Sequence, residues 1–251
     1  MEVTVETFTA PLRAYKEFED LEAAFSKIKG ILQISGCIDA AKPHMMYGIR
    51  NGAGKRLIVT FQEQKAREFC EEYRFFCKNT AYYPAKDILF YQSDLRGNAL
   101  TAERINALKM LAEEESCAIV TTFDALMNPM PDAKRIFLSV LKIAAAQPVR
   151  MEDIVRRLIE LGYEKNYQAE AIGEFAVRGG IIDIFPLTEE NPIRIELWGD
   201  EVDSIRSFDA SSQRSIANLE EVFIYPACEL VLTEEERLAG AERIEKEAKE
   251  V

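Results

Sequence analysis

Two stretches of alternating apolar and polar residues constrain the fold of this chain most. In residues 173–186, GEFAVRGGIIDIFP, apolar side chains alternate on both sides of the pair Gly179-Gly180. Residues 192–209, PIRIELWGDEVDSIRSFD, repeat the arrangement around a Gly-Asp pair. A period of two on both sides of a two-residue turn is typical of a β-hairpin. We therefore expect two antiparallel hairpins in this part of the chain.

The first half of the sequence has a different periodicity. Apolar residues recur at helical spacing in residues 13–29, 62–77 and 100–115. Short apolar runs typical of buried strands lie between and beside them, at residues 31–35, 56–61, 80–84 and 117–122. Strands that alternate with helices predict a mostly parallel sheet with helices on its faces.

A proline-marked stretch, NPMPDAKR at residues 128–135, separates the two kinds of pattern. We expect an α/β domain formed by residues 1–126 and 210–251, split by an inserted antiparallel α+β domain at residues 127–209 that also holds a helix at 151–162. The last residues, TEEERLAGAERIEKEAKEV, have a charged helical pattern that stops without a cap. We expect the parent chain to continue beyond them.

The loop after the strand predicted at residues 31–35 looks like a phosphate-binding loop that has decayed. A working loop reads GxxxxGK[ST], with glycines that let backbone N–H groups approach phosphates, a lysine, and a hydroxyl that binds magnesium. Gly36 and Lys42 match this pattern, but Ala41 replaces the second glycine and Pro43 replaces the hydroxyl. Asp39 also adds a negative charge inside the loop. Each change disfavours a bound triphosphate.

No second nucleotide motif compensates for these changes. An apolar run that ends in Asp-Glu, which would supply the magnesium ligand, is absent, and Asp183 lies within the first hairpin. The stretch NGAGKR at residues 51–56 precedes a strand instead of following one, so we interpret it as a turn. We expect no catalysis and no nucleotide cofactor in this chain.

The composition limits the other function classes. The net charge of −12 argues against autonomous binding to nucleic acid, which usually requires a basic face. Five cysteines without a CxxC pair and a single histidine give no metal-site spacing, and we expect reduced thiols in a cytoplasmic protein. The sequence has no signal-peptide pattern and no apolar run long enough to span a bilayer.

Several motifs together carry a resemblance to a known family. The run GEFAVRGGIIDIFP…PIRIELWGDEVDSIRSFDASSQRS closely resembles the UvrB-like module of bacterial transcription-repair coupling factors. The stretches YYPAKDILFYQSD and ERINALKMLAEEESCAIVTTFDALMNPMP resemble the first domain of the same family. The resemblance covers most of the chain.

This resemblance implies an architecture and a partner. It implies a helicase-like α/β domain with a decayed P-loop, split by an inserted domain that docks on the repair protein UvrA. It also implies that the ATP- and Mg-dependent translocase and the contacts with RNA polymerase and DNA reside in parts of the parent chain outside this sequence, whose domains are further partners. No membrane partner is expected.

The resemblance assigns the UvrA-binding role to Arg178, Arg194, Glu196 and Trp198, by match to the motifs FAVRGG and IRIELW. The first three occupy the polar phase of their strands, so we expect them to share a solvent-facing surface on which both arginines are exposed. One role open to Glu196 is to orient Arg194. The same alternation of charges could also make ordinary cross-strand pairs that only solubilise a sheet, and Trp198 could equally be half-buried.

Two other functions remain open at this point. One is an unusual P-loop NTPase, and the other is a damaged-DNA-binding protein of the UvrB type. UvrB differs from this chain in its intact P-loop, in a long tyrosine-rich hairpin that the short stretch YQSDLRGNALTAER cannot replace, and in an arginine where this chain has Ala176.

Overall fold

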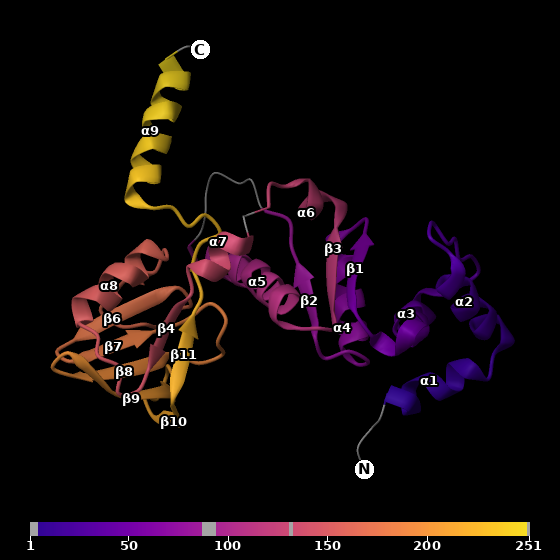
Figure 1. The fold of residues 1–251 in the computed structure, drawn as a ribbon, viewed down its shortest axis with the longest axis horizontal. Helices are drawn as coiled ribbons and strands as arrows, with labels where there is room; N and C mark the ends of the chain where they lie inside the picture. Colours follow the sequence, from indigo (N-terminus) through magenta and orange to yellow (C-terminus); the bar gives the residue numbers. More distant parts are fainter. Residues whose placement is uncertain (1–4, 87–93, 131–132, 250–251) are drawn as a thin grey trace. The chain divides into compact units, whose positions relative to one another are not determined.

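The computed structural model describes residues 5–86, 94–130 and 133–249. It is a mixed α/β protein with one parallel sheet and mainly antiparallel sheets (Figure 1). The chain divides into two compact units. The first contains residues 1–87 and 106–129, and the second contains residues 88–105 and 130–251.

The first unit is built on a parallel three-stranded sheet of order β1-β3-β2. The sequence predicted all three strands, and β3 begins and ends where the apolar run does. The elements of the first part of the chain are α1 (Val5–Arg13), α2 (Lys16–Lys27), the 3-10 turn η1 (Asp39–Ala41), α3 (Lys42–Gly48), the 3-10 turn η2 (Ile49–Gly52), β1 (Lys55–Thr60), α4 (Glu63–Arg74), β2 (Thr80–Tyr83), α5 (Asp94–Glu113), β3 (Cys117–Thr122) and α6 (Phe123–Met127). Helix α5 crosses the boundary between the two units.

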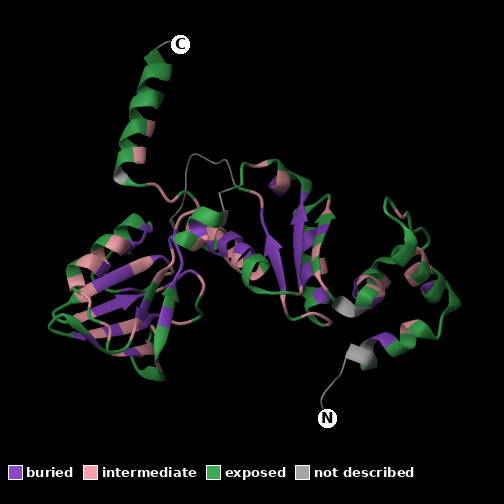
Figure 2. Ribbon diagram, in the orientation of Figure 1, coloured by how far each residue is buried: buried purple, intermediate pink, exposed green. Residues whose placement is uncertain are grey.

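The amphipathic pattern of α4 explains the core of this unit. Its apolar positions Ala66, Cys70 and Tyr73 are buried against the sheet residues Ile58 and Val120. Burial of one helix face against one sheet face removes apolar surface from water, which is the main stabilising contribution in such a layer. The buried residues of the unit accordingly gather on the central strand β3 and on the helix beside it (Figure 2).

The prediction of a strand at residues 31–35 is wrong. These residues form no strand, and the Ile31 side chain is 97% exposed. An apolar run of this length becomes a buried strand only if a neighbouring strand hydrogen-bonds to it, and no strand of the described residues does so here. The loop that begins at Gly36 therefore does not follow a strand.

The second unit is built on a six-stranded sheet of order β10-β9-β8-β7-β6-β5. Both predicted hairpins are confirmed, as β6 with β7 and β8 with β9, and β7 also pairs with β8. Gly179 and Gly199 occupy the first turn positions with φ of +58° and +62°, which two-residue hairpin turns require there. The elements are α7 (Ala133–Leu138), β4 (Leu141–Ala144), α8 (Met151–Glu160), β5 (Glu164–Lys165), β6 (Glu174–Arg178), β7 (Ile181–Ile184), β8 (Ile193–Trp198), β9 (Glu201–Phe208), β10 (Ser215–Leu219), β11 (Glu221–Ile224) and α9 (Glu234–Lys249).

The division into units differs from the predicted domains after residue 209. The segment 210–251 clusters with the hairpin region, whereas the sequence placed it with the first domain. The reason is β-pairing: β10 adds to β9, and β11 pairs with β4 in a separate two-stranded sheet. The backbone after β4 also bonds to β9, through the N–H of Ala146 to the carbonyl of Val202 at 2.8 Å.

Candidate binding surface

In the loop from Gly36 to Pro43, the single cationic side chain, Lys42, forms an ion pair with Asp39 of the same loop. Gly36 has φ of +80°, while Ala41 lies in helical conformation at the N-cap of α3. The Nζ of Lys42 lies 2.6 Å from the Oδ1 of Asp39, and both side chains are exposed. This hydrogen bond and charge pairing lower the pKa of Asp39 and raise the pKa of Lys42.

The start of the following helix is also unlike a phosphate site. Pro43 is buried in the first turn of α3, where it offers neither a hydroxyl nor a backbone N–H. The helix has only seven residues. With no strand before the loop, nothing aligns its N–H groups around an anion.

The four residues predicted for partner binding lie on one face of the six-stranded sheet. Arg178 is opposite Ile181, which is opposite Glu196, so these three residues form one cross-strand row. Arg194 is two residues from Glu196 on the same strand and therefore points to the same side. Trp198 follows at the end of β8. We call this set, with Asp183, the arginine face.

Asp183 is the one member of the arginine face that the sequence analysis did not assign to partner binding. It lies on β7, directly opposite Arg194, and its side chain is 3% exposed. Its Oδ1 accepts a hydrogen bond from the Nε of Arg194 at 2.6 Å, and its Oδ2 accepts from the Nη2 of Arg194 at 2.9 Å and of Arg178 at 2.6 Å. Aligning the two hairpins in register would have found it, because Asp183 occupies the polar phase of IIDI.

The expectation that both arginines are exposed is wrong for Arg194. Its side chain is 17% exposed, because the guanidinium bonds to Asp183 and lies 4.5 Å from the ring centroid of Phe208. The hydrogen bond that Arg194 donates to Asp183 raises the pKa of Arg194, so the guanidinium stays charged. Arg178 is the more accessible partner, with 47% of its side chain exposed.

Glu196 does not hydrogen-bond to Arg194. It forms an ion pair with Arg206 of β9 and accepts a hydrogen bond from the Oγ of Ser204 at 3.0 Å. The role considered for Glu196, to orient Arg194, belongs to Asp183.

Trp198 is open to solvent, with 85% of the residue exposed. It lies next to the hairpin turn at Gly199, and the register of β8 with β9 shifts between Glu196 and Leu197. Tryptophan and arginine are the residue types enriched among the side chains that dominate protein interfaces.

The charged groups of the arginine face are paired within the sheet. Two guanidinium groups share one buried carboxylate, which leaves an excess of one positive charge for an acidic partner. Among the described residues, no group of three or more His, Cys, Asp or Glu side chains could hold a metal ion. No helix in the described ranges has the length and apolar character needed to cross a membrane.

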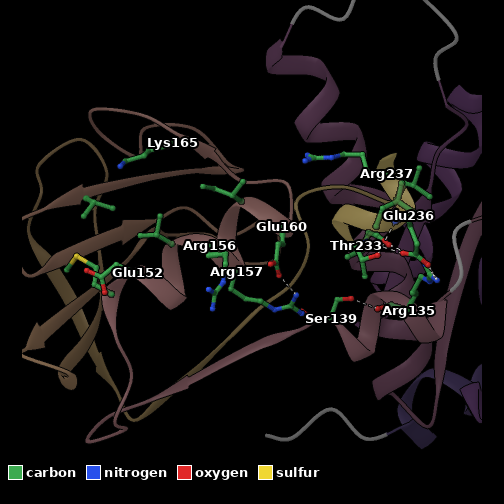
Figure 3. Close-up of a pocket in the computed structure, with 17 residues that line it drawn as sticks. Arg135, Ser139, Glu152, Arg156, Arg157, Glu160, Lys165, Thr233, Glu236 and Arg237 are labelled. Atoms are coloured by element: carbon green, nitrogen blue, oxygen red, sulfur yellow. Dashed lines mark hydrogen bonds and ion pairs between the residues drawn. The ribbon is translucent and has the colours of Figure 1, made fainter. Parts of the chain in front are cut away.

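The same unit also contains a cavity that the sequence did not predict. A cavity of about 1000 Å³ lies between α7, α8 and the segment leading into α9 (Figure 3). Figure 3 shows the side chains of Arg135 and Glu236 pointing toward each other, with Arg135 Nη2 2.6 Å from Glu236 Oε1. Arg157 donates to the carbonyl of Ser139 at 3.0 Å. The cations that line this cavity are thus largely engaged with neighbouring groups.

Comparison with known proteins defines the class of the second unit. Residues 141–230 match the family model described as the UvrB interaction domain. This range begins at β4 and extends past β11, so it includes the arginine face and the two-stranded sheet beside it.

The whole chain is similar to transcription-repair coupling factors, which confirms the resemblance drawn from the sequence. It is 30% identical to the transcription-repair-coupling factor of Bacillus subtilis (strain 168) over 236 residues, 92% of this chain and 20% of that protein. The protein of the same name from Staphylococcus aureus (strain bovine RF122 / ET3-1) is 30% identical over 90% of this chain and 19% of its own length. In strain MRSA252 the identity is 36% over 61% of this chain. The chain thus spans about a fifth of the length of the curated relatives that match most of it.

Proposed function

We propose that this chain is the UvrA-recruiting part of a transcription-repair coupling factor and acts by binding, without catalysis of its own. The observation that carries the proposal is the arginine face, which lies inside the match to the UvrB interaction domain. The similarity to transcription-repair coupling factors over 92% of the chain supports the repair context.

Arg178 is the residue through which the partner would be recognised most directly. Its Nη2 bonds to Asp183, and it has no other hydrogen bond or ion pair with a described residue. A planar guanidinium pairs with a carboxylate through two parallel bonds, which an ammonium group cannot do. Trp198 would supply an apolar contact on the same face. Arg194 would contribute a positive charge whose position is fixed by its bonds to Asp183.

The decayed P-loop and the inserted arrangement of the second domain are further parts of this proposal. The loop from Gly36 to Pro43 would keep a structural role only, with Lys42 held by Asp39. The inserted domain would extend from residue 127 to 209, and β11 from the segment after it would pair with β4. RNA polymerase, DNA, ATP and Mg would be bound by other parts of the parent chain, in the cytoplasm.

Calorimetric titration of the chain with purified UvrA tests the proposal. The wild-type chain should bind saturably, and Arg178→Ala should weaken binding by about 2–5 kcal/mol, because it leaves a partner carboxylate unpaired. Arg156→Ala is the matched control: Arg156 is an exposed arginine on α8 that pairs with Asp153, away from the arginine face. No saturable binding of the wild-type chain, or equal losses in both variants, would refute the proposal.

A further inference from the structure

Asp183 occupies a position that few carboxylates have in a protein. It lies on β7 in the interior of the six-stranded sheet, is almost fully buried, and has hydrogen bonds on both of its oxygens. Burial of a charge costs free energy unless it is paired and hydrogen-bonded, so this site is stable only with its guanidinium partners in place. The carboxylate therefore fixes the positions of two side chains that come from the strands on either side of it, β6 and β8.

We propose that Asp183 is a positioning residue for UvrA binding, which holds the Arg178 guanidinium in the orientation that a partner carboxylate recognises. This inference rests on the function proposed above. Arg178 itself touches the partner, whereas Asp183 acts through it. A free arginine side chain loses rotamer entropy when it is fixed, and pre-orientation in the unbound protein removes part of that cost from binding.

The two arginines differ in how many of their guanidinium donors are bonded within the protein. Arg194 uses Nε and Nη2 on Asp183, and Nη2 also lies 2.9 Å from the Oε1 of Gln213. Arg178 donates to Asp183 through Nη2 alone. Arg194 is thus a fixed internal charge, while Arg178 keeps Nε and Nη1 for another molecule.

The loop that carries Gln213 is itself fixed, which strengthens the hold on Arg194. Gln213 has φ of +59°, its N–H donates to the carbonyl of Asp209 at 2.8 Å, and its Nε2 donates to the carbonyl of Ala210 at 2.9 Å. The amide oxygen therefore points at Arg194 from a tight turn. Arg194 thus holds Asp183 in a fixed position, and Arg178 donates its hydrogen bond to this fixed acceptor.

The neighbouring carboxylate provides a matched comparison. Glu196 lies on the same face and pairs with Arg206, but it makes no hydrogen bond to Arg178. Its removal changes the charge of the face by the same amount as removal of Asp183. If only net charge mattered, the two changes would affect UvrA binding equally.

The experiment measures UvrA affinity for Asp183→Asn, Glu196→Gln and Arg178→Ala, and for the double variant Asp183→Asn, Arg178→Ala. Affinities are corrected for the folded fraction measured by circular dichroism at the same temperature. We expect Asp183→Asn to weaken binding by about tenfold or more, within the range for disturbed interfacial charge pairs, and Glu196→Gln to weaken it less. In the Arg178→Ala background, Asp183→Asn should have little further effect, because residues that act as a unit are not additive.

Arg178→Lys keeps the test informative if Asp183→Asn does not fold. This change leaves the bonds between Asp183 and Arg194 intact and alters only a half-exposed side chain. It should lower affinity by about tenfold, since an ammonium group cannot be held in a forked orientation. Additive losses in the double variant, or wild-type affinity in Arg178→Lys, would overturn the inference. If the wild-type chain does not bind UvrA, the proposed function is refuted. If the wild-type chain binds UvrA and Arg178→Ala weakens binding but Asp183→Asn does not, only the inference about Asp183 is refuted.

Discussion

The loop at residues 36–43 and the arginine face each hold cations against a carboxylate, but they do so in opposite ways. In the loop, Lys42 pairs with Asp39, three residues away in the sequence, and both are exposed. In the sheet, Arg194 pairs with Asp183, eleven residues away and almost fully buried. The first contact is local and surrounded by water, while the second depends on the register of β7 with β8.

This difference decides whether the charged side chains keep a defined geometry. An exposed pair contributes little and exchanges readily with solvent, so it does not fix a geometry. A buried pair is costly to break, so its charges keep their positions while a partner approaches. The arginine face therefore has the rigidity that a binding site needs, and the loop does not.

Arg194→Ala should produce the largest loss of stability among these changes. It removes two of the three hydrogen bonds that the arginines donate to the buried carboxylate of Asp183, and the contact with Phe208. We expect a decrease of about 3 kcal/mol in the free energy of unfolding, as for other broken buried pairs. Urea denaturation followed by circular dichroism measures it. A loss below about 0.5 kcal/mol, the range of ordinary surface substitutions, would mean that the sheet tolerates an isolated Asp183.

Arg178→Ala should have a smaller effect on stability and a larger one on partner binding. Asp183 keeps its two bonds to Arg194 in this variant, and Arg178 is half-exposed. We expect a loss of at most about 1 kcal/mol in the free energy of unfolding. The same urea experiment checks it. Equal losses for both arginine variants would remove the distinction between a fixed and an accessible arginine.

The hairpins were predictable because their signals are local. Alternation on both sides of Gly179-Gly180 predicts which residues pair within the first hairpin, and the same pattern places Glu196 and Trp198 on one face of the second hairpin. The indole is exposed, which answers the question that the sequence left open. The third strand contact, between β7 and β8, lies between the two hairpins, and it is the one that brings Asp183 to Arg194.

The errors concern residues whose structure depends on distant partners. The run at residues 31–35 has the composition of a strand, but no strand among the described residues pairs with it. Strand β11 was not predicted, since its short run gains a partner only through β4, about eighty residues earlier. The burial of Arg194 could not be deduced from its polar phase, because a polar phase does not distinguish solvent from a buried carboxylate.

The Arg135–Glu236 pair is an intermediate case, which is non-local like the arginine face but exposed like the loop. Bonds from Arg135 and from the backbone N–H of Thr233 lower the pKa of Glu236 from 4.5 to about 2. The pKa of the folded state lies below that of the unfolded state, so the stabilisation is present above pH 4.5 and is lost as the pH falls toward 2. Glu236→Gln should therefore be less stable than wild type at neutral pH, by a small amount, with a difference that shrinks in acid.

Urea midpoints at neutral and acidic pH measure this effect. Glu235→Gln, the same change one residue earlier on α9, is the control. A difference between wild type and Glu236→Gln that stays constant with pH would show that the pair contributes through packing instead of charge.

The smallest effect is expected at the loop, where Lys42→Ala should leave stability and ligand binding unchanged. Lys42 and Asp39 are exposed and form an ion pair with each other, so removal of Lys42 leaves no buried charge without a partner. Calorimetric titration with Mg-ATP should give no saturable heat for wild type, for Lys42→Ala, or for the double variant Ala41→Gly, Pro43→Thr. The double variant restores the loop residues of the motif but not the strand before it or an acidic magnesium ligand, and phosphate binding needs all three. Saturable binding of Mg-ATP by the wild-type chain that disappears in Lys42→Ala would reverse the comparison, because the loop would then be the working site.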